Sequence, residues 1–158
     1  MRTQENYFKE LSGKKVILVD FDNTIVYDSW PYIGGLIPGA IEVLKKLQEE
    51  GHRIILWTQR TKEYPVCCKE LEDYSEAVYG KILDKVDLLT PALNLLEKVG
   101  IRVEANQNTQ WESSTGDHGR KVFNDFIIDD HSVGMKLIDG RCDWDFIKSW
   151  CIDEGLIK

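Results

Sequence analysis

The chain has 158 residues, a length that predicts one domain of about 150 residues with a core of its own. Its 42% hydrophobic and 30% charged residues, together with 4 prolines, exclude a disordered, collagen-like or low-complexity protein. The net charge of −7 argues against a protein that grips nucleic acids or anionic membranes through their phosphates.

The cysteines fit neither a zinc site nor a disulfide framework, because Cys67 and Cys68 are adjacent while Cys142 and Cys151 are isolated. Free thiols in a reducing compartment are therefore expected. Residues 1–15 are charged throughout and lack the apolar stretch of a secretion signal, and no run approaches the length of a membrane span. We therefore expect a cytoplasmic protein that binds no membrane.

The first predicted element is a strand over residues 15–20, an almost continuous apolar run that ends in Asp20. Such a run is typical of a strand buried on both faces of a parallel sheet. A loop rich in glycine and proline leads to a helix over residues 40–47, which Gly51 ends, and a second apolar strand follows over residues 53–58. Strand, helix and strand in this order predict a βαβ unit with parallel strands.

The second half of the chain continues the alternation of helices and strands. Thr90 and Pro91 favour a helix start, so a helix is expected through Val99. A third strand is predicted over residues 101–105, and a polar loop over residues 106–119 follows it. A loop of this length in a compact domain is often functional.

Further stretches complete the outline. Residues 61–89 form an insertion beyond a minimal α/β unit, with a helix expected over residues 66–79. A fourth apolar strand is predicted over residues 126–128, and an amphipathic helix over residues 143–152. Residues 1–158 are thus expected to form one doubly wound α/β domain with a mainly parallel sheet and a small helical insertion.

Polar side chains stand at the ends of several predicted strands. Asp20 and Asp22 follow the first strand, Thr58 ends the second, and Asp129 and Asp130 follow the fourth. The carboxyl ends of parallel strands meet at one edge of a sheet, where ligands bind, so we expect these side chains to converge. The alternative for each aspartate alone is that it caps the turn after its strand. Together, carboxylates at one edge repel one another unless a cation or a proton relieves them.

Hard oxygen ligands of this kind favour Mg²⁺, which also accepts phosphate oxygens, so the edge predicts a site for Mg²⁺ and a phosphorylated compound. Asp20 and Asp22 point the same way in an extended chain, so that one can attack phosphorus while the other transfers the proton. Lys121, with Arg120 as the alternative, can bring a cation to the same edge. The competing interpretation for Lys121 is a solvated surface position.

These residues give the sequence a resemblance to the haloacid dehalogenase (HAD) superfamily of phosphohydrolases that use an aspartate nucleophile. The resemblance rests on ordered motifs: residues 20–24 (DFDNT) after an apolar strand, Thr58 at the end of the next strand, Lys121, and residues 129–130 after the fourth strand. Residues 31–34, 37–38, 54–60 and 128–134 look like a group of small bacterial members without a cap. The resemblance implies a HAD-like three-layer sandwich that lacks a large cap domain.

The resemblance also implies a mechanism. Asp20 would attack phosphorus to form an aspartyl phosphate, and Asp22 would protonate the leaving group and then activate water. Thr58, Gln59 and Lys121 would hold the transferring phosphoryl group. The Mg²⁺ ligands that the resemblance implies are acidic residues at the strand ends: Asp20, Asp22 through its main-chain carbonyl, Asp129 and Asp130.

The expected function is a Mg²⁺-dependent phosphatase for phosphomonoesters such as nucleotides or other small phosphorylated metabolites. The net charge counts against a long polynucleotide substrate, but Trp30 and Trp111, in loops near the expected cavity mouth, can stack on a base, so a nucleotide or a nucleic-acid end fits. The insertion at 61–89 and the loop at 106–119 are candidates for a small lid. The alternatives are a phosphotransferase and a noncatalytic phosphorylation switch of the receiver type, in which the motif order differs.

Overall fold

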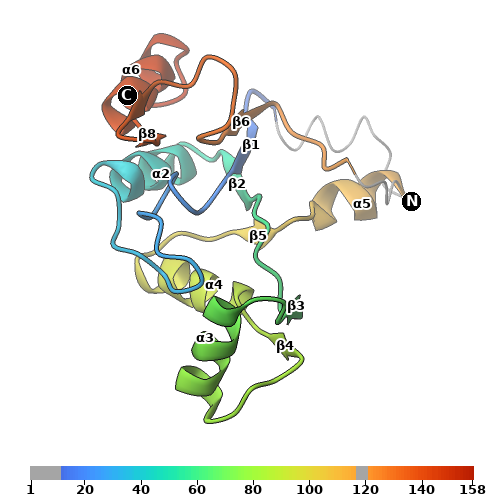
Figure 1. Cartoon of the computed structure of the whole chain (residues 1–158). Helices are drawn as coiled ribbons and strands as arrows, with labels where there is room; N and C mark the ends of the chain where they lie inside the picture. Colours follow the sequence, from blue (N-terminus) through green and yellow to red (C-terminus); the bar gives the residue numbers. More distant parts are fainter. Residues whose placement is uncertain (1–11, 117–120) are drawn as a thin grey trace.

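The fold is built on a parallel sheet of four short strands (Figure 1). The computed structural model describes residues 12–116 and 121–158. The strands follow the order β5-β2-β1-β6, and each pairs in parallel with its neighbour. Their bounds are Val16–Val19 for β1, Arg53–Leu56 for β2, Glu104–Ala105 for β5 and Phe126–Ile128 for β6.

One face of the sheet carries the main core. Ile17 and Val19 of β1 pack there against α2 (Ala40–Glu49), α4 (Leu89–Lys98) and α6 (Trp144–Asp153), whose apolar faces belong to the same buried cluster. The parallel pairing of β1 with β2 confirms the predicted βαβ unit, with α2 as its helix. The arrangement is an α/β fold with a parallel sheet and is consistent with a Rossmann-like fold.

The opposite face of the sheet carries a smaller cluster. Val16, Leu18 and Ile55 point to this face because side chains alternate along a strand. Trp111 packs against them from α5 (Thr109–Thr115), a helix that lies beside the sheet. Apolar side chains therefore cover the sheet on both faces, and the strands can be as uniformly apolar as the sequence shows.

The prediction of a loop throughout residues 106–119 is wrong, because α5 forms within it. The side chain of Asn108 accepts a hydrogen bond from the backbone N–H of Trp111 at 3.1 Å and so caps the first turn of the helix. The Trp111 ring stacks on Phe123, with centroids 4.4 Å apart, and this contact holds the short helix on the sheet.

The insertion after β2 forms a small unit with its own apolar cluster. It contains α3 (Lys69–Tyr79) and the two-stranded antiparallel pair of β3 (Tyr64–Pro65) and β4 (Lys85–Val86). Figure 1 shows this unit at the end of the molecule opposite α6. The apolar residues that hold the unit together are buried: Leu71, Tyr74, Val86 and Leu88.

The chain finishes with a short hairpin and α6. The hairpin pairs β7 (Leu137–Ile138) with β8 (Arg141–Cys142). Asp143 follows the hairpin and caps α6, because its side chain accepts hydrogen bonds from two backbone N–H groups of the first turn. All four cysteines are free, as predicted. Within the described residues no helix is both long enough and apolar enough to cross a membrane.

Candidate active site

The strand register brings polar residues to one edge of the sheet. Val19 pairs with Leu56 and with Ile128, so the residues that follow them begin at the same level. Backbone bonds extend this pairing by one step, from the N–H of Asp20 to the Ile128 carbonyl at 2.9 Å and from the N–H of Trp57 to the Val19 carbonyl at 2.8 Å. The predicted convergence at the carboxyl edge is therefore confirmed.

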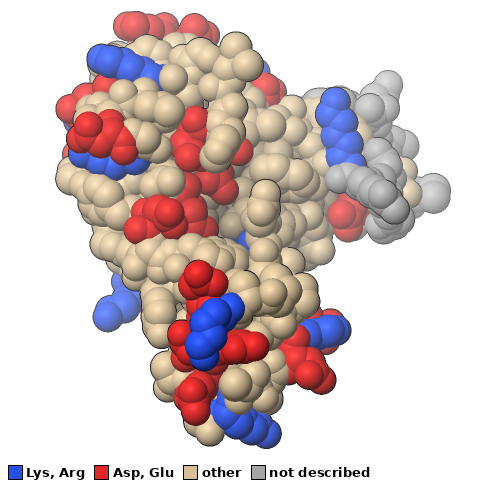
Figure 2. Space-filling model, viewed as in Figure 1, with Lys and Arg blue, Asp and Glu red and all other residues tan. Residues whose placement is uncertain are grey.

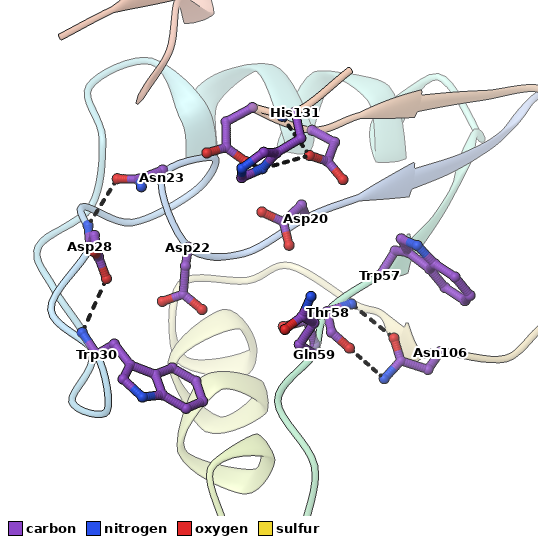
Figure 3. Close-up of a pocket in the computed structure, with 12 residues that line it drawn as sticks. Asp20, Asp22, Asn23, Asp28, Trp30, Trp57, Thr58, Gln59, Asn106 and His131 are labelled. Atoms are coloured by element: carbon purple, nitrogen blue, oxygen red, sulfur yellow. Dashed lines mark hydrogen bonds and ion pairs between the residues drawn. The ribbon is translucent and has the colours of Figure 1, made fainter. Parts of the chain in front are cut away.

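A cavity of about 670 Å³ opens at this edge (Figure 3). On the face shown in Figure 2, acidic side chains gather between the region that holds α6 and the region that holds α3. The cavity lining combines carboxylates, amides, one hydroxyl, one imidazole and two indoles: Asp20, Asp22, Asn23, Asp28, Trp30, Trp57, Thr58, Gln59, Asn106, Asp129, Asp130 and His131.

Asp20 stands at the end of β1, among other carboxylates. The pKa of Asp20 is raised to about 7, mainly by burial and also by the charges of Asp129 and Asp130, while the hydrogen bonds from the Phe21 backbone and from Thr24 act in the opposite direction. Such a carboxylate is stabilised as an anion only when a cation joins the cluster. The site thus places a partly buried carboxylate beside other carboxylates, where added positive charge would stabilise its ionised form.

Thr24 holds Asp20 from behind and is fully buried. Its hydroxyl donates to Oδ2 of Asp20 at 3.1 Å and accepts the backbone N–H of Asp130 at 3.2 Å. The Cys142 thiol donates to the Thr24 hydroxyl oxygen, with Sγ 3.7 Å from Oγ1. A hydroxyl has one hydrogen and two acceptor positions, so Thr24 uses its full hydrogen-bonding capacity to tie β1, β6 and β8 together at the site.

Asp22 has a partner of opposite charge. Both of its carboxylate oxygens accept hydrogen bonds from Arg60, with Oδ2 2.8 Å from Nε and Oδ1 2.6 Å from Nη2. The Arg60 side chain is 1% exposed and the Asp22 side chain 26% exposed, so the carboxylate reaches the cavity while the guanidinium lies behind it. In Figure 3, Asp22 points toward the Trp30 side of the cavity, away from His131.

Thr58 follows β2 and is held by a pair of hydrogen bonds from the next strand. Its backbone N–H donates to Oδ1 of Asn106 at 2.8 Å, and its carbonyl accepts Nδ2 of Asn106 at 2.9 Å (Figure 3). Asn106 follows β5 with a φ of 56°, a conformation that asparagine adopts more readily than most residues. The pair keeps the loop that contains Thr58 and Gln59 open toward the cavity.

The Asp129–His131 turn forms the opposite side of the cavity. Nδ1 of His131 lies 2.8 Å from Oδ1 of Asp130, and this contact raises the pKa of His131. The ligand atoms of Asp129, Asp130 and His131 all lie within 4.8 Å of one another, a spacing that suits a metal ion. Two of these three groups are carboxylates, the hard oxygen donors that Mg²⁺ prefers, and the third is an imidazole.

Trp30 forms a wall of the cavity mouth. The backbone N–H of Trp30 donates to Oδ1 of Asp28 at 3.2 Å, and its ring meets Tyr64 of the insertion edge to face, with centroids 5.0 Å apart. The loop turns back so tightly at Gly34 that a Cβ there would lie 2.0 Å from the carbonyl oxygen of Tyr27. Trp30 thus connects the cavity to the 61–89 insertion.

The structure does not bring every predicted residue to the cavity. Lys121 is exposed and is not among the lining residues within the described part of the chain. Arg120, the alternative cation, lies outside the described residues. Trp111, predicted near the cavity mouth, is not among the lining residues either: its ring stacks on Phe123 in the cluster around Val16 and Leu18.

Comparisons with known proteins give one informative relative. Neither a family model nor a curated protein matches the chain. A solved structure, that of a conserved protein from Bacteroides thetaiotaomicron, is 33% identical, with a TM-score of 0.61. The match covers 90% of this chain and 92% of that protein. This chain belongs to the same family as that protein.

Several residues at or beside the cavity were not predicted from the sequence as parts of the site. Asn106 is a polar residue directly after a strand, the same signal that identified Asp20, and could have been found that way. Trp57 follows β2 and also lines the cavity. Arg60 belongs to the stretch 54–60 that contributes to the resemblance, but its burial and its pairing with Asp22 were not predicted, because the partners that bury it lie far away along the chain.

Proposed function

We propose that the protein is a Mg²⁺-dependent phosphomonoesterase of the HAD type, with Asp20 as the nucleophile. The observation that supports this most strongly is the convergence of Asp20, Asp22, Thr58 and Asp129 from three parallel strand ends in one cavity. Phosphoryl transfer depends mainly on in-line positioning and on positive charge at the phosphoryl oxygens, and these carboxylates would hold a cation that supplies such charge. A doubly wound HAD-type sandwich without a large cap is part of the same proposal.

In the first half of the reaction, an Oδ atom of Asp20 attacks phosphorus. The new bond joins Asp20 to the phosphoryl group, the bond to the leaving oxygen breaks, and Asp22 gives that oxygen a proton. In the second half, Asp22 takes a proton from water as the water attacks phosphorus, and Asp20 is released as a carboxylate. The two aspartates therefore have separate roles, with one bonded to phosphorus and the other moving the proton.

Thr58 and Gln59 stand where they can hold the phosphoryl oxygens. Asn106 binds the backbone of Thr58 on both sides, which leaves the Thr58 hydroxyl and the Gln59 amide at the cavity. Asp20, Asp129 and the Asp22 carbonyl would hold Mg²⁺, with Asp130 as a further ligand. The ion would supply the positive charge that lets an anionic nucleophile approach an anionic substrate.

The cavity favours a small substrate over a polymer. Trp30 and Trp57 line it with indole rings, which can stack on a base or a sugar next to the phosphate. The net charge of −7 opposes the binding of a long polynucleotide backbone. Nucleotides and other small phosphomonoesters are therefore the substrate class that we propose.

The test is phosphate release from a panel of phosphomonoesters, with and without Mg²⁺, by the wild-type protein and by Asp20→Asn. We expect release that needs Mg²⁺ and falls to background in Asp20→Asn, because an amide oxygen is a poor nucleophile. Circular dichroism of both proteins checks that the variant is folded. Release by Asp20→Asn at the wild-type rate would overturn the proposal, and Asp20 phosphorylation without turnover would point to a switch instead.

A further inference from the structure

Arg60 is a buried cation next to the cavity. It lies in the loop after β2, where its backbone N–H donates to the hydroxyl of Thr58 at 3.2 Å. Its side chain is 1% exposed. An arginine is almost never buried to this degree unless its charge is paired. Here the partner is Asp22, whose carboxylate receives two parallel hydrogen bonds from one edge of the guanidinium.

The remaining donors of Arg60 bind the loop that carries Trp30. Nη1 donates to the carbonyl of Pro31 at 3.0 Å, and Nη2 donates to the carbonyl of Tyr32 at 3.0 Å. The guanidinium carbon also lies 5.4 Å from the ring centroid of Phe21 and 5.1 Å from that of Trp30. One side chain thus holds the carboxylate of Asp22 and the wall of the cavity mouth together.

The geometry leaves Asp22 free to move a proton. A carboxylate has about four acceptor positions, and Arg60 occupies one on each oxygen. The pair fixes the plane of the carboxylate, and the other positions stay open on the side that lines the cavity. An ammonium group could supply the charge but not the planar pair of donors, so lysine could not hold the carboxylate in the same orientation.

We propose that Arg60 is the positioning residue for Asp22: it orients this carboxylate for proton transfer to the leaving oxygen. The inference rests on the proposed function and adds to it a residue that does not touch the substrate. It predicts that the loss of Arg60 harms the protonation of the leaving group more than any other part of the reaction. Asp20 and its contacts are not part of this effect, because none of the Arg60 bonds reaches them.

The experiment compares two substrates with different leaving groups. An alkyl phosphate needs a proton on its leaving oxygen, whereas p-nitrophenyl phosphate releases a stable anion that needs little help. The quantity measured is kcat/KM, which reports only the steps up to release of the leaving group. The proteins are the wild type, Arg60→Lys, Asp22→Asn, the double variant and Arg53→Lys as the matched control.

Arg53 is a suitable control because it is another arginine paired with a carboxylate near β2. Its Nη2 lies 2.9 Å from Oε2 of Glu104, its side chain is 26% exposed, and it does not line the cavity. We expect Arg53→Lys to leave the ratio of kcat/KM for the two substrates unchanged. A general effect of an arginine-to-lysine change on stability would appear in this control as well.

For Arg60→Lys, we expect kcat/KM to fall about 100-fold with the alkyl phosphate and less than about 10-fold with p-nitrophenyl phosphate. Asp22→Asn should show the same selectivity. The double variant should be no worse than Asp22→Asn alone, because Arg60 acts through Asp22. If Arg60→Lys loses the wild-type circular dichroism spectrum, Arg60→Gln takes its place, since its planar amide can still donate to one carboxylate oxygen.

An equal loss with both substrates, or a further loss in the double variant, would overturn the inference and leave Arg60 with a structural role. This failure is distinct from failure of the proposed function. A wild-type protein that hydrolyses both substrates only with Mg²⁺, beside an inactive Asp20→Asn, supports the proposed function whatever Arg60→Lys does. A wild-type protein that hydrolyses neither substrate removes both proposals together.

Discussion

Asp20 and Asp22 leave the same strand end two residues apart, yet they have opposite electrostatic surroundings. Asp20 faces Asp129 and Asp130, whose charges add to the effect of burial and raise its pKa. Asp22 faces the guanidinium of Arg60 with both oxygens. Among the described residues that line the cavity, the Asp20 side therefore holds three carboxylates and the imidazole of His131, whereas the Asp22 side has an arginine bound to its carboxylate.

This difference explains how two like residues can have different roles. A carboxylate crowded by others is relieved by a proton or by a cation, so the Asp20 side suits the metal that we propose for it. A carboxylate paired with a buried arginine needs no such ion, so the Asp22 side is suited to hold one orientation throughout.

The largest effect that should separate the two sides is on metal affinity. Asp129→Asn removes a charge from the crowded side and should weaken Mg²⁺ binding by about 100-fold. Asp22→Asn should leave the Mg²⁺ affinity little changed, because only its main-chain carbonyl is expected to bind the ion. Isothermal titration calorimetry with Mg²⁺ alone measures both, and equal losses in the two variants would contradict the division of the cavity.

A smaller effect is expected at Thr24, which braces the crowded side. Thr24→Val keeps the shape but leaves the partly buried N–H of Asp130 without its acceptor, at a cost of about 2 kcal/mol in the free energy of unfolding. Thr24→Ser, the control, keeps the hydroxyl and should lose less. Urea denaturation measures both variants. A Thr24→Ser protein as unstable as Thr24→Val would mean that the methyl group, and not the hydrogen bonds, stabilises the site.

The crowded side could be predicted from the sequence, because its pattern is local. Asp20 and Asp129 each end an apolar run, and parallel strands bring such ends to one edge, so the residues and their convergence follow from two short segments. Of the helices that cover the main-core face, α2 and α6 followed from apolar periodicity and α4 from its start signal at Thr90 and Pro91. Thr58 belongs to the same pattern and lines the cavity as expected.

The paired side could not be predicted, because it depends on contacts between distant segments. Arg60 is buried by carbonyls of Pro31 and Tyr32, which only the folded loop brings near. Trp111 shows the same limit, since a polar stretch suggested a loop at the cavity mouth and tertiary packing against Phe123 placed it elsewhere. Periodicity reports which residues share a face, but it does not report which distant groups meet.

The last and smallest effect concerns stability without metal. Between pH 3.8 and about 7 the folded protein keeps a proton on Asp20 that the unfolded chain has released, so its stability falls as the pH rises through this window. Asp20→Asn cannot carry the charge and escapes this loss. In EDTA above pH 7 it should therefore be more stable than the wild type by about 1 kcal/mol, a rise in Tm of about 2–4 °C. The gain should vanish below pH 3.8, where Asp20 is protonated in both states.

Added Mg²⁺ is the control for this last prediction. The ion stabilises the folded wild-type protein by binding to it, and Asp20→Asn, with one ligand charge fewer, should gain less. The order of the two Tm values should therefore reverse between EDTA and saturating Mg²⁺. The opposite result would be an Asp20→Asn protein that is less stable than the wild type in EDTA above pH 7. It would show that repulsion among these carboxylates does not destabilise the fold, and the contrast with Asp22 would lose its electrostatic basis.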